Sequence, residues 1–273
     1  MTISIYIATQ RNIGEFKNSC YKPIYVGAAL LPKATLDCMN YQRDDTDDNI
    51  SMKNKSFCEL TALYWMWKNN ESDIVGLMHY RRYLSTKKYC NRLDDILTED
   101  DIQKKLEGYD IILPKKYCVY GKVIDQYSTG QYSKDLELAG DIIKKNYSDF
   151  YSDYIDIIHS DSLYICNMFI AKKDLVDQYC NWLFPILFEL ENEIDITEYS
   201  TSEKRVYGYI AERLFNVWIK HENLTILEEY MYNTEQTFFD RFKRSIHLFN
   251  YKVLRINVLK YMNNRRGKRN ANI

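Results

Sequence analysis

The chain of 273 residues is 46% hydrophobic and 27% charged, a composition that is typical of globular proteins and excludes the disordered and fibrous classes. A chain of this length accommodates one large α/β domain or two small ones. The formal net charge is −1, so the protein as a whole does not attract nucleic acid, and any anion-binding site must be local.

The seven cysteines are scattered and form no CxxC pair, which argues against a disulfide scaffold and against a zinc ribbon. The first residues lack a basic segment and a cleavage site, so no signal peptide is expected. No apolar run approaches the roughly eighteen residues of a membrane span. The sequence therefore predicts a reduced, cytosolic protein.

Apolar periodicity predicts an alternation of strands and helices along the chain. Short apolar runs bounded by polar residues predict strands at 3–8, 23–29, 73–79, 109–113, 162–171 and 224–227. Apolar residues at helical spacing predict helices at 51–68, 135–146, 174–193 and 203–221. Residues 98–101 (Thr-Glu-Asp-Asp) resemble a capping box, which predicts a further short helix that ends near 108.

This alternation predicts an α/β fold with a mainly parallel central sheet, in a single domain over residues 1–232. In such sheets ligands bind beyond the carboxyl ends of the strands. That rule indicates the loops after Ala8, His79 and Leu113 and the end of the strand at 165–171. Thr9, in the first of these loops, is taken as a donor contact. The sequence contains neither GxGxxG nor GxxxxGK[ST], so neither a dinucleotide fold nor a P-loop is supported.

The most informative run is His-Tyr-Arg-Arg-Tyr at 79–83, directly after a predicted buried strand. Apolar strands usually lead into turn residues, whereas this one leads into an imidazole, two guanidiniums and two phenols. Guanidiniums match phosphate oxygens, and each charge-assisted hydrogen bond contributes about 1.5–3 kcal/mol net. His79, Tyr80, Arg81 and Arg82 are therefore candidates for binding a diphosphate. The alternative is that both arginines form structural salt bridges.

A second candidate region begins at Asn49. Ser51 is a good N-cap, and a helix N-terminus offers free N–H groups and the positive end of a dipole. Lys53 and Asn54 would add a charge and an amide suited to a nucleotide or a phosphate. Glu59 follows among apolar residues and needs a partner, for which an arginine of the His-Tyr-Arg-Arg-Tyr run is the candidate. The alternative is a solvated helix start with an exposed Glu59.

These runs carry a resemblance to a known family. Residues 49–69 and 73–84 together resemble the signature of the bacterial domain-of-unknown-function 4422 family, whose members take part in capsule, exopolysaccharide and O-antigen assembly. Weaker matches follow at 109–114, 167–170, 179–184 and 205–214, so the resemblance extends to about residue 220. It implies a GT-A-like (Rossmann-like) glycosyltransferase fold and a nucleotide-sugar donor.

Two departures from the expected patterns bear on substrate and metal. The family often has a histidine after the tyrosine that corresponds to Tyr127, whereas here Ser-Thr-Gly-Gln follows, so a polar contact there has changed with the substrate; Tyr127 and Gln131 are taken as acceptor contacts. GT-A enzymes generally carry Asp-x-Asp where this chain has His79, which suggests leaving-group stabilisation without a metal. The acidic loop 44–49 could bind Mg²⁺ or Mn²⁺ instead, although such loops are usually solvated.

The predicted helix at 203–221 places Arg205, Gly208 and Glu212 on one side, away from an apolar stripe. Glu212 is the candidate general base that activates an acceptor hydroxyl. Arg205 would steer the donor or orient that carboxylate, and His79 completes the catalytic candidates. Asn167 is a candidate for hydrogen bonds to sugar or acceptor hydroxyls. The alternative is that Glu212 pairs with Arg213 or Arg205 on the surface.

The end of the chain, 233–273, is predicted to be a basic helical extension. From Arg241 to Arg269 it carries ten Lys or Arg and no acid, interleaved with apolar residues. A basic amphipathic helix is typical of membrane-surface binding, at about 1 kcal/mol per basic residue near an anionic leaflet. The alternatives are packing on the domain or, without any supporting motif, RNA binding.

The sequence as a whole favours a cytoplasmic enzyme at the inner face of the cell membrane. It would move a sugar from a nucleotide-diphosphate donor, such as a UDP-linked hexose (galactose among them), to a hydroxyl of a lipid-linked oligosaccharide. The alternative from another class is a non-catalytic nucleotide- or saccharide-binding subunit of a polysaccharide assembly complex. A nucleotidyltransferase fits poorly, because it normally uses clustered carboxylates to hold two metals.

Overall fold

The computed structural model describes residues 1–32 and 40–236. The strands are β1 (Ile3–Thr9), β2 (Tyr21–Tyr25), β3 (Gln42–Arg43), β4 (Ile74–His79), β5 (Arg82–Ser85), β6 (Ile111–Pro114), β7 (Tyr117–Cys118), β8 (Ser162–Leu163), β9 (Phe169–Lys172) and β10 (Ile226–Asn233). Eight of them form one sheet in the order β3-β2-β1-β4-β5-β10-β6-β9, in which β9 also pairs with β4. β7 and β8 form a separate two-stranded sheet.

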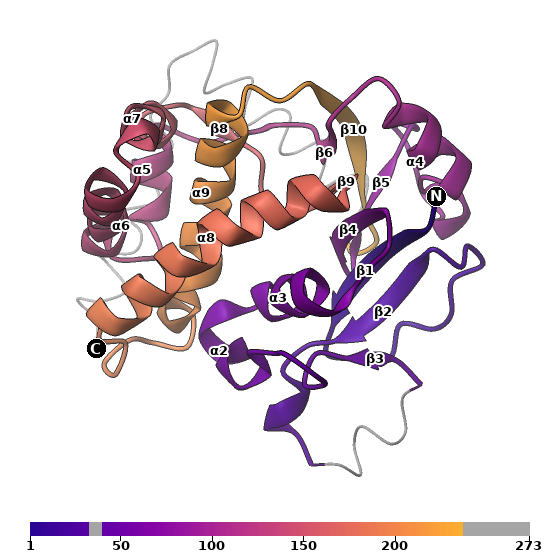
Figure 1. Ribbon diagram of the computed structural model, residues 1–273, viewed down its shortest axis with the longest axis horizontal. Helices are drawn as coiled ribbons and strands as arrows, with labels where there is room; N and C mark the ends of the chain where they lie inside the picture. Colours follow the sequence, from indigo (N-terminus) through magenta and orange to yellow (C-terminus); the bar gives the residue numbers. More distant parts are fainter. Residues whose placement is uncertain (33–39, 237–273) are drawn as a thin grey trace.

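The helices lie mostly on one side of the molecule. They are α2 (Asn54–Phe57), α3 (Leu60–Asn69), α4 (Glu99–Lys105), α5 (Val123–Tyr127), α6 (Ser133–Asn146), α7 (Tyr151–Ile158), α8 (Lys173–Glu193) and α9 (Val206–His221). Single 3-10 turns lie at Ala28–Leu30, Ser51–Lys53, Leu93–Asp95, Ser148–Phe150 and Glu203–Arg205. In Figure 1, α5, α6 and α7 gather at one side, and α8 runs from the sheet toward them.

The sheet is mixed, so the expectation of a mainly parallel sheet is wrong. β3, β2, β1 and β4 pair in parallel, as do β6 and β10. β9 runs antiparallel to both β4 and β6, and β5 runs antiparallel to β4 and β10. Four of the pairings described in this sheet are parallel and four antiparallel, because the two short strands β5 and β9 run against their neighbours.

Alternate side chains of β1 divide the core between the two faces of the sheet. All seven residues of β1 are buried, which places it in the interior. Ile5 and Ile7 pack on one face with Ile102 of α4. Tyr6 and Ala8 pack on the other face, in the larger core that α3, α8 and α9 share.

The sequence predictions for β1, β4, β6 and α8 are confirmed to within two residues, and so is the capping box at Thr98. The predicted continuous helix at 51–68 is broken at Cys58, which has a φ of 54°. The Asn54 amide causes the break, because its Nδ2 donates to the Cys58 carbonyl oxygen at 2.7 Å.

The predicted strand at 162–171 is also interrupted. It divides into β8 and β9, and between them Cys166 and Asn167 have φ values of 74° and 49°. Such left-handed conformations cost non-glycine residues of order 1–3 kcal/mol and persist only where surrounding contacts hold them. Both interruptions lie beside the candidate site described below.

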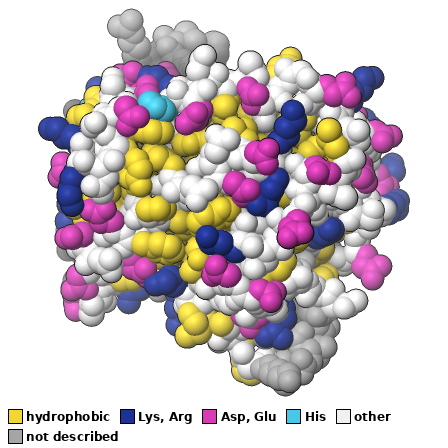
Figure 2. Space-filling model, viewed as in Figure 1, with side chains coloured by type: hydrophobic (Ala, Val, Ile, Leu, Met, Phe, Trp, Pro, Cys, Tyr) yellow, Lys and Arg dark blue, Asp and Glu magenta, His cyan; other side chains and the backbone are white. Residues whose placement is uncertain are grey.

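The candidate extension cannot be followed beyond Gln236, because residues 237–273 lie outside the described part of the chain. Within 1–32 and 40–236, no helix has the length and apolar character needed to cross a bilayer. Figure 2 shows Lys and Arg side chains interspersed with Asp and Glu over the visible face, so no patch of a single charge dominates it.

Gly76 lies where β4 and β9 approach each other closely. A Cβ there would lie 2.8 Å from the Phe169 carbonyl oxygen and 2.9 Å from Ile5 Cδ1. We expect Gly76→Ala to lower the free energy of unfolding by about 1–3 kcal/mol, because the backbone oxygen cannot move away without disturbing the sheet. Denaturant unfolding measures the change.

Gly108→Ala is the matched control, since a Cβ at this glycine would have no neighbouring atom within 4 Å among the described residues. Its free energy of unfolding should change by less than about 0.5 kcal/mol. Equal stability of the two variants would contradict the close β4–β9 contact.

Candidate functional site

The His-Tyr-Arg-Arg-Tyr run is a tight reversal between two strands and not a loop. His79 ends β4 and pairs directly with Arg82, which begins β5. Directly paired residues of antiparallel strands project from the same face, so the His79 and Arg82 side chains are neighbours. Tyr80 and Arg81 form the tip, where the Tyr83 hydroxyl donates to the Tyr80 carbonyl oxygen at 2.7 Å.

His79 is held by the strained backbone at Cys166. Its Nε2 lies 2.6 Å from the Cys166 carbonyl oxygen. Burial lowers the pKa of His79 below its ordinary value, against the opposing effect of Glu59. The imidazole is therefore neutral near pH 7, and Nε2 carries the proton that it donates to Cys166.

The two adjacent arginines have different surroundings. Arg81 Nη1 lies 2.7 Å from the Glu235 carboxylate. Among the described residues no carboxylate lies within ion-pair distance of Arg82. Burial lowers the pKa of His79 and the Arg82 charge adds to this, whereas the same charge opposes the rise that burial causes in the pKa of Cys166 and of Glu212. Arg82 thus carries a positive charge without a carboxylate partner among the described residues, and this charge acts on Glu212.

Glu212 projects from α9 toward the same backbone segment. Its Oε1 accepts a 2.8 Å hydrogen bond from the Cys166 N–H, and its Oε2 lies 3.0 Å from Arg213 Nη1. The predicted alternative of pairing with Arg213 is thus present, although the pair is not on the surface, because the two side chains are 18% and 2% exposed. Burial raises the pKa of Glu212 more than Arg213 lowers it.

Arg213 is a buried support behind this site. Its guanidinium donates to the Tyr209 carbonyl oxygen and to Gln126, and it lies over the Tyr127 ring at 5.2 Å. Tyr127 is 2% exposed and Gln131 8%, and Gln131 donates to the Ser202 carbonyl oxygen. A direct contact of either side chain with an acceptor would therefore require movement of this part of the chain.

Glu59 reaches the site from the N-terminal edge of α3. The expectation that an arginine of 79–83 is its partner is wrong, because Glu59 Oε1 accepts a 2.8 Å hydrogen bond from Asn167 Nδ2. The left-handed backbone of Asn167 directs its amide toward α3 and α9, where Nδ2 also lies 3.3 Å from the Gly208 carbonyl oxygen. Asn167 Oδ1 is buried without a protein partner in the described residues.

Arg205 is fixed at the start of α9 by a thiol. Its Nε donates to Cys58 Sγ at 3.2 Å, and its guanidinium lies 5.5 Å from the Tyr209 ring centroid. The protein itself occupies the space beside Gly208, since a Cβ there would lie 3.3 Å from Cys58 Cβ. Gly208 therefore allows α9 to pack closely against the break between α2 and α3.

The predicted anion site at the start of the 51–68 helix is not formed. Ser51 begins a single 3-10 turn, and its hydroxyl donates to Asp44 at 2.5 Å. Lys53 Nζ is held 2.6 Å from Glu191 of α8. The Asn54 amide is used by Cys58, by Thr61 and by Gln10, whose Nε2 donates to Asn54 Oδ1.

The remaining two predicted donor contacts have local partners. Thr9 is 1% exposed, and its hydroxyl donates to the Arg11 carbonyl oxygen at 2.8 Å. The Asn49 side chain joins its neighbours, accepting from the Ser51 N–H and donating to the Asp47 carbonyl oxygen. Both side chains are thus engaged by residues close to them in the chain.

The acidic loop at 44–49 also serves the fold. Asp44 is fully buried and accepts hydrogen bonds from the Gly27 and Ala28 N–H groups, while Asp45 pairs with Arg43. In the part of the chain that is described, no group of three or more His, Cys, Asp or Glu side chains is arranged to hold a metal ion. The Asp44 and Asp45 carboxylates are instead engaged by backbone N–H groups and by an arginine.

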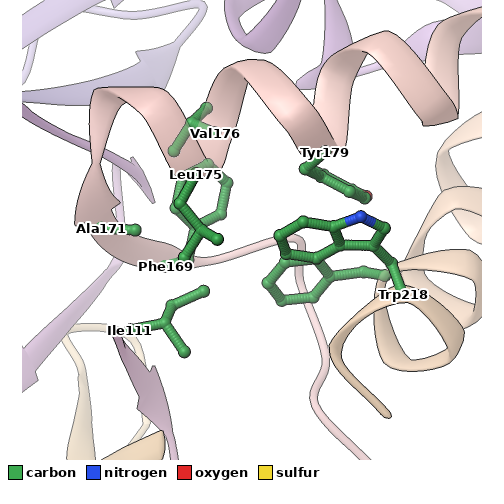
Figure 3. Close-up of a pocket in the computed structure, with 8 residues that line it drawn as sticks. Ile111, Phe169, Ala171, Leu175, Val176, Tyr179 and Trp218 are labelled. Atoms are coloured by element: carbon green, nitrogen blue, oxygen red, sulfur yellow. The ribbon is translucent and has the colours of Figure 1, made fainter. Parts of the chain in front are cut away.

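A small pocket lies between α8, α9 and the strands β6 and β9 (Figure 3). Figure 3 shows Val176, Leu175 and Tyr179 on α8 facing Trp218 on α9 and Ile111 on β6. None of the side chains that line it is charged. It is a gap in the apolar core and carries no group that would bind a diphosphate.

Arg11 was not predicted as a site residue, and Arg213 was predicted only as a surface partner of Glu212. Arg11 follows β1 as Arg81 follows β4, and it lies over the Tyr80 ring at 4.1 Å. The polar residues that follow the first strand could have indicated Arg11, because β1 and β4 are parallel neighbours and end at the same edge of the sheet. The Cys166 carbonyl oxygen contacts His79 and its N–H binds Glu212. Both contacts depend on tertiary structure, so no local sequence pattern indicates them.

Comparisons with known proteins agree with this architecture. The apo structure of WbbM, a bifunctional glycosyltransferase, is 34% identical to this chain with a TM-score of 0.78. The match covers 86% of this chain and 46% of that one, so this chain spans about half the length of WbbM. No curated protein matches. The fold is thus a mixed α/β fold similar to that of a glycosyltransferase.

The family model described as domain of unknown function 4422 matches residues 4–223. That range includes β1, the β4–β5 reversal, the Cys166–Asn167 segment and α9, which together build the candidate site. The chain therefore belongs to the family described as domain of unknown function 4422.

Proposed function

We propose that this protein transfers a sugar from a nucleotide-diphosphate donor to a hydroxyl of a growing capsular, exopolysaccharide or O-antigen oligosaccharide. The observation that carries the proposal is the position of Arg82. It supplies a positive charge with no described carboxylate partner at the start of β5, opposite the last residue of β4, and this charge acts on the raised-pKa carboxylate of Glu212. Similarity to the glycosyltransferase WbbM supports the same class of reaction.

In the proposed reaction an acceptor hydroxyl oxygen attacks the anomeric carbon, and the bond from that carbon to the diphosphate oxygen breaks. Arg82, with Arg81, stabilises the negative charge on the departing diphosphate. The hydroxyl proton passes to the Glu212 carboxylate, whose remaining lone pairs are free to accept it. His79 acts as a neutral donor that fixes Cys166, so it positions Glu212 without carrying charge.

The donor is proposed to be a UDP-linked hexose, galactose among them, and the acceptor a lipid-linked saccharide. Glu59 is bound by Asn167, and Arg205 is bound by Cys58, the residue before Glu59; these three side chains would contact the sugar or orient its neighbours. The basic segment 241–269 would place the enzyme at the inner membrane surface.

A thermal-shift screen of nucleotide-sugars tests donor and metal use together. Binding to the folded state stabilises it by about 2.7 kcal/mol at a ligand concentration of about one hundred times Kd. We expect a nucleotide-sugar to raise Tm equally with EDTA and with Mn²⁺, because guanidinium groups take the place of a metal. A shift that requires Mn²⁺ would show that the diphosphate is held through a cation.

Arg82→Ala should lower kcat/KM for that donor about ten- to a hundredfold, the equivalent of one or more lost charge-assisted hydrogen bonds at about 1.5–3 kcal/mol each. Steady-state kinetics measures the loss, and thermal unfolding confirms that the variant folds. Arg92→Ala is the matched control, because Arg92 is 70% exposed and pairs with Asp94. Unchanged kinetics of Arg82→Ala would refute its role in donor binding.

Glu212→Gln should lower kcat about a hundred- to ten-thousandfold with a smaller change in donor KM. The wild-type rate should fall as the pH drops through the Glu212 pKa, since only the carboxylate accepts a proton. Because this pKa is raised, the fall begins at a higher pH than for an ordinary glutamate. The residual rate of Glu212→Gln should not show this fall at low pH. An unaltered fall in the variant would rule out Glu212 as the general base.

A further inference from the structure

Arg11, Tyr80, Arg81 and Glu235 form a charged cluster at the edge of the sheet beyond β1 and β4. The Glu235 carboxylate bridges the two arginines, with Oε1 2.6 Å from Arg11 Nη2 and Oε2 2.7 Å from Arg81 Nη1. The Tyr80 ring lies 4.1 Å from the Arg11 guanidinium carbon and 5.4 Å from that of Arg81. The single Glu235 carboxylate therefore forms ion pairs with both guanidiniums at the same time.

The backbone holds this arrangement in place. The end of β10 pairs with β5 through Asn233 and Arg82, and the Thr234 N–H donates to the Arg81 carbonyl oxygen at 2.9 Å. The Glu235 N–H donates to Asn233 Oδ1 at 3.0 Å. Glu235 is thus carried by a tight turn that brings its carboxylate to the two arginines that lie near the Tyr80 ring.

The cluster is accessible and only partly neutralised. The side chains of Arg11, Arg81 and Glu235 are 57%, 36% and 40% exposed. One carboxylate against two guanidiniums leaves a net charge of +1. Guanidiniums bind carboxylate and phosphate oxygens with the same fork geometry, so a diphosphate can take the place of the carboxylate and bring more charge.

We propose that Arg11 and Arg81 form a binding site for the diphosphate of a nucleotide, and that Glu235 occupies this site as an internal competitor until the ligand displaces it. This inference rests on the proposed function, and it adds Arg11 and Glu235 to the donor site. Each donor that binds must break both Glu235 ion pairs. The affinity for diphosphate is therefore lower than the two arginines would give without Glu235.

Titration calorimetry with pyrophosphate alone tests the competition without turnover. Glu235→Gln should bind pyrophosphate about two- to tenfold more tightly than the wild type, the range expected for removing exposed ion pairs. Glu235→Asp keeps the charge but is one methylene shorter and cannot bridge both arginines, so its affinity should also rise. Arg11→Ala should bind pyrophosphate more weakly.

Asp94→Asn is the matched control, because Asp94 is also exposed and lies between two basic side chains, Lys17 and Arg92. Its affinity for pyrophosphate should equal that of the wild type. If Glu235→Asp binds like the wild type, or if Arg11→Ala loses no affinity, the displacement model is overturned. If Arg82→Ala still weakens pyrophosphate binding in that case, the proposed function stands without the displacement model. If neither the wild type nor any variant binds pyrophosphate, the displacement model and the proposed function are both overturned.

Discussion

The strained peptide at Cys166 is the constraint on which the candidate site depends. Its N–H binds Glu212 of α9, and its carbonyl oxygen binds His79 at the end of β4. The adjacent Asn167, also left-handed, binds Glu59 at the start of α3. Two residues of unfavourable backbone thus join three elements that are distant in the sequence, and the contacts that they make offset the conformational cost.

This arrangement separates the charges that the chemistry needs. Glu59 and Glu212 are held by hydrogen bonds from Asn167 and Cys166, so the arginines at the β4–β5 reversal are not used to neutralise them. A neutral His79 adds no competing charge, because burial lowers its pKa. Positive charge therefore remains at the sheet edge, where a departing diphosphate would need it, and carboxylates remain on the helix side, where a proton would be accepted.

The sequence predicted those features that local pattern determines. The exit of β4 into basic residues, the strong apolar runs of β1 and β6 and the capping box at Thr98 follow from neighbouring residues alone. The break at Cys166 depends on a distant partner, Glu212, and the Asn54 amide that binds the Cys58 carbonyl oxygen also accepts from the distant Gln10. For the same reason Lys53 and Asn54, which suited a phosphate in sequence, are engaged by partners from elsewhere in the fold.

Whether a guanidinium or a cation holds the diphosphate can be decided by a crystal structure of the protein with a nucleoside diphosphate bound, solved once with EDTA and once with Mn²⁺. We expect the β-phosphate oxygens to lie within hydrogen-bond distance of the Arg82 guanidinium in both. A diphosphate bound away from the β4–β5 reversal, or held through a cation on the 44–49 loop, would contradict the proposed role of Arg82.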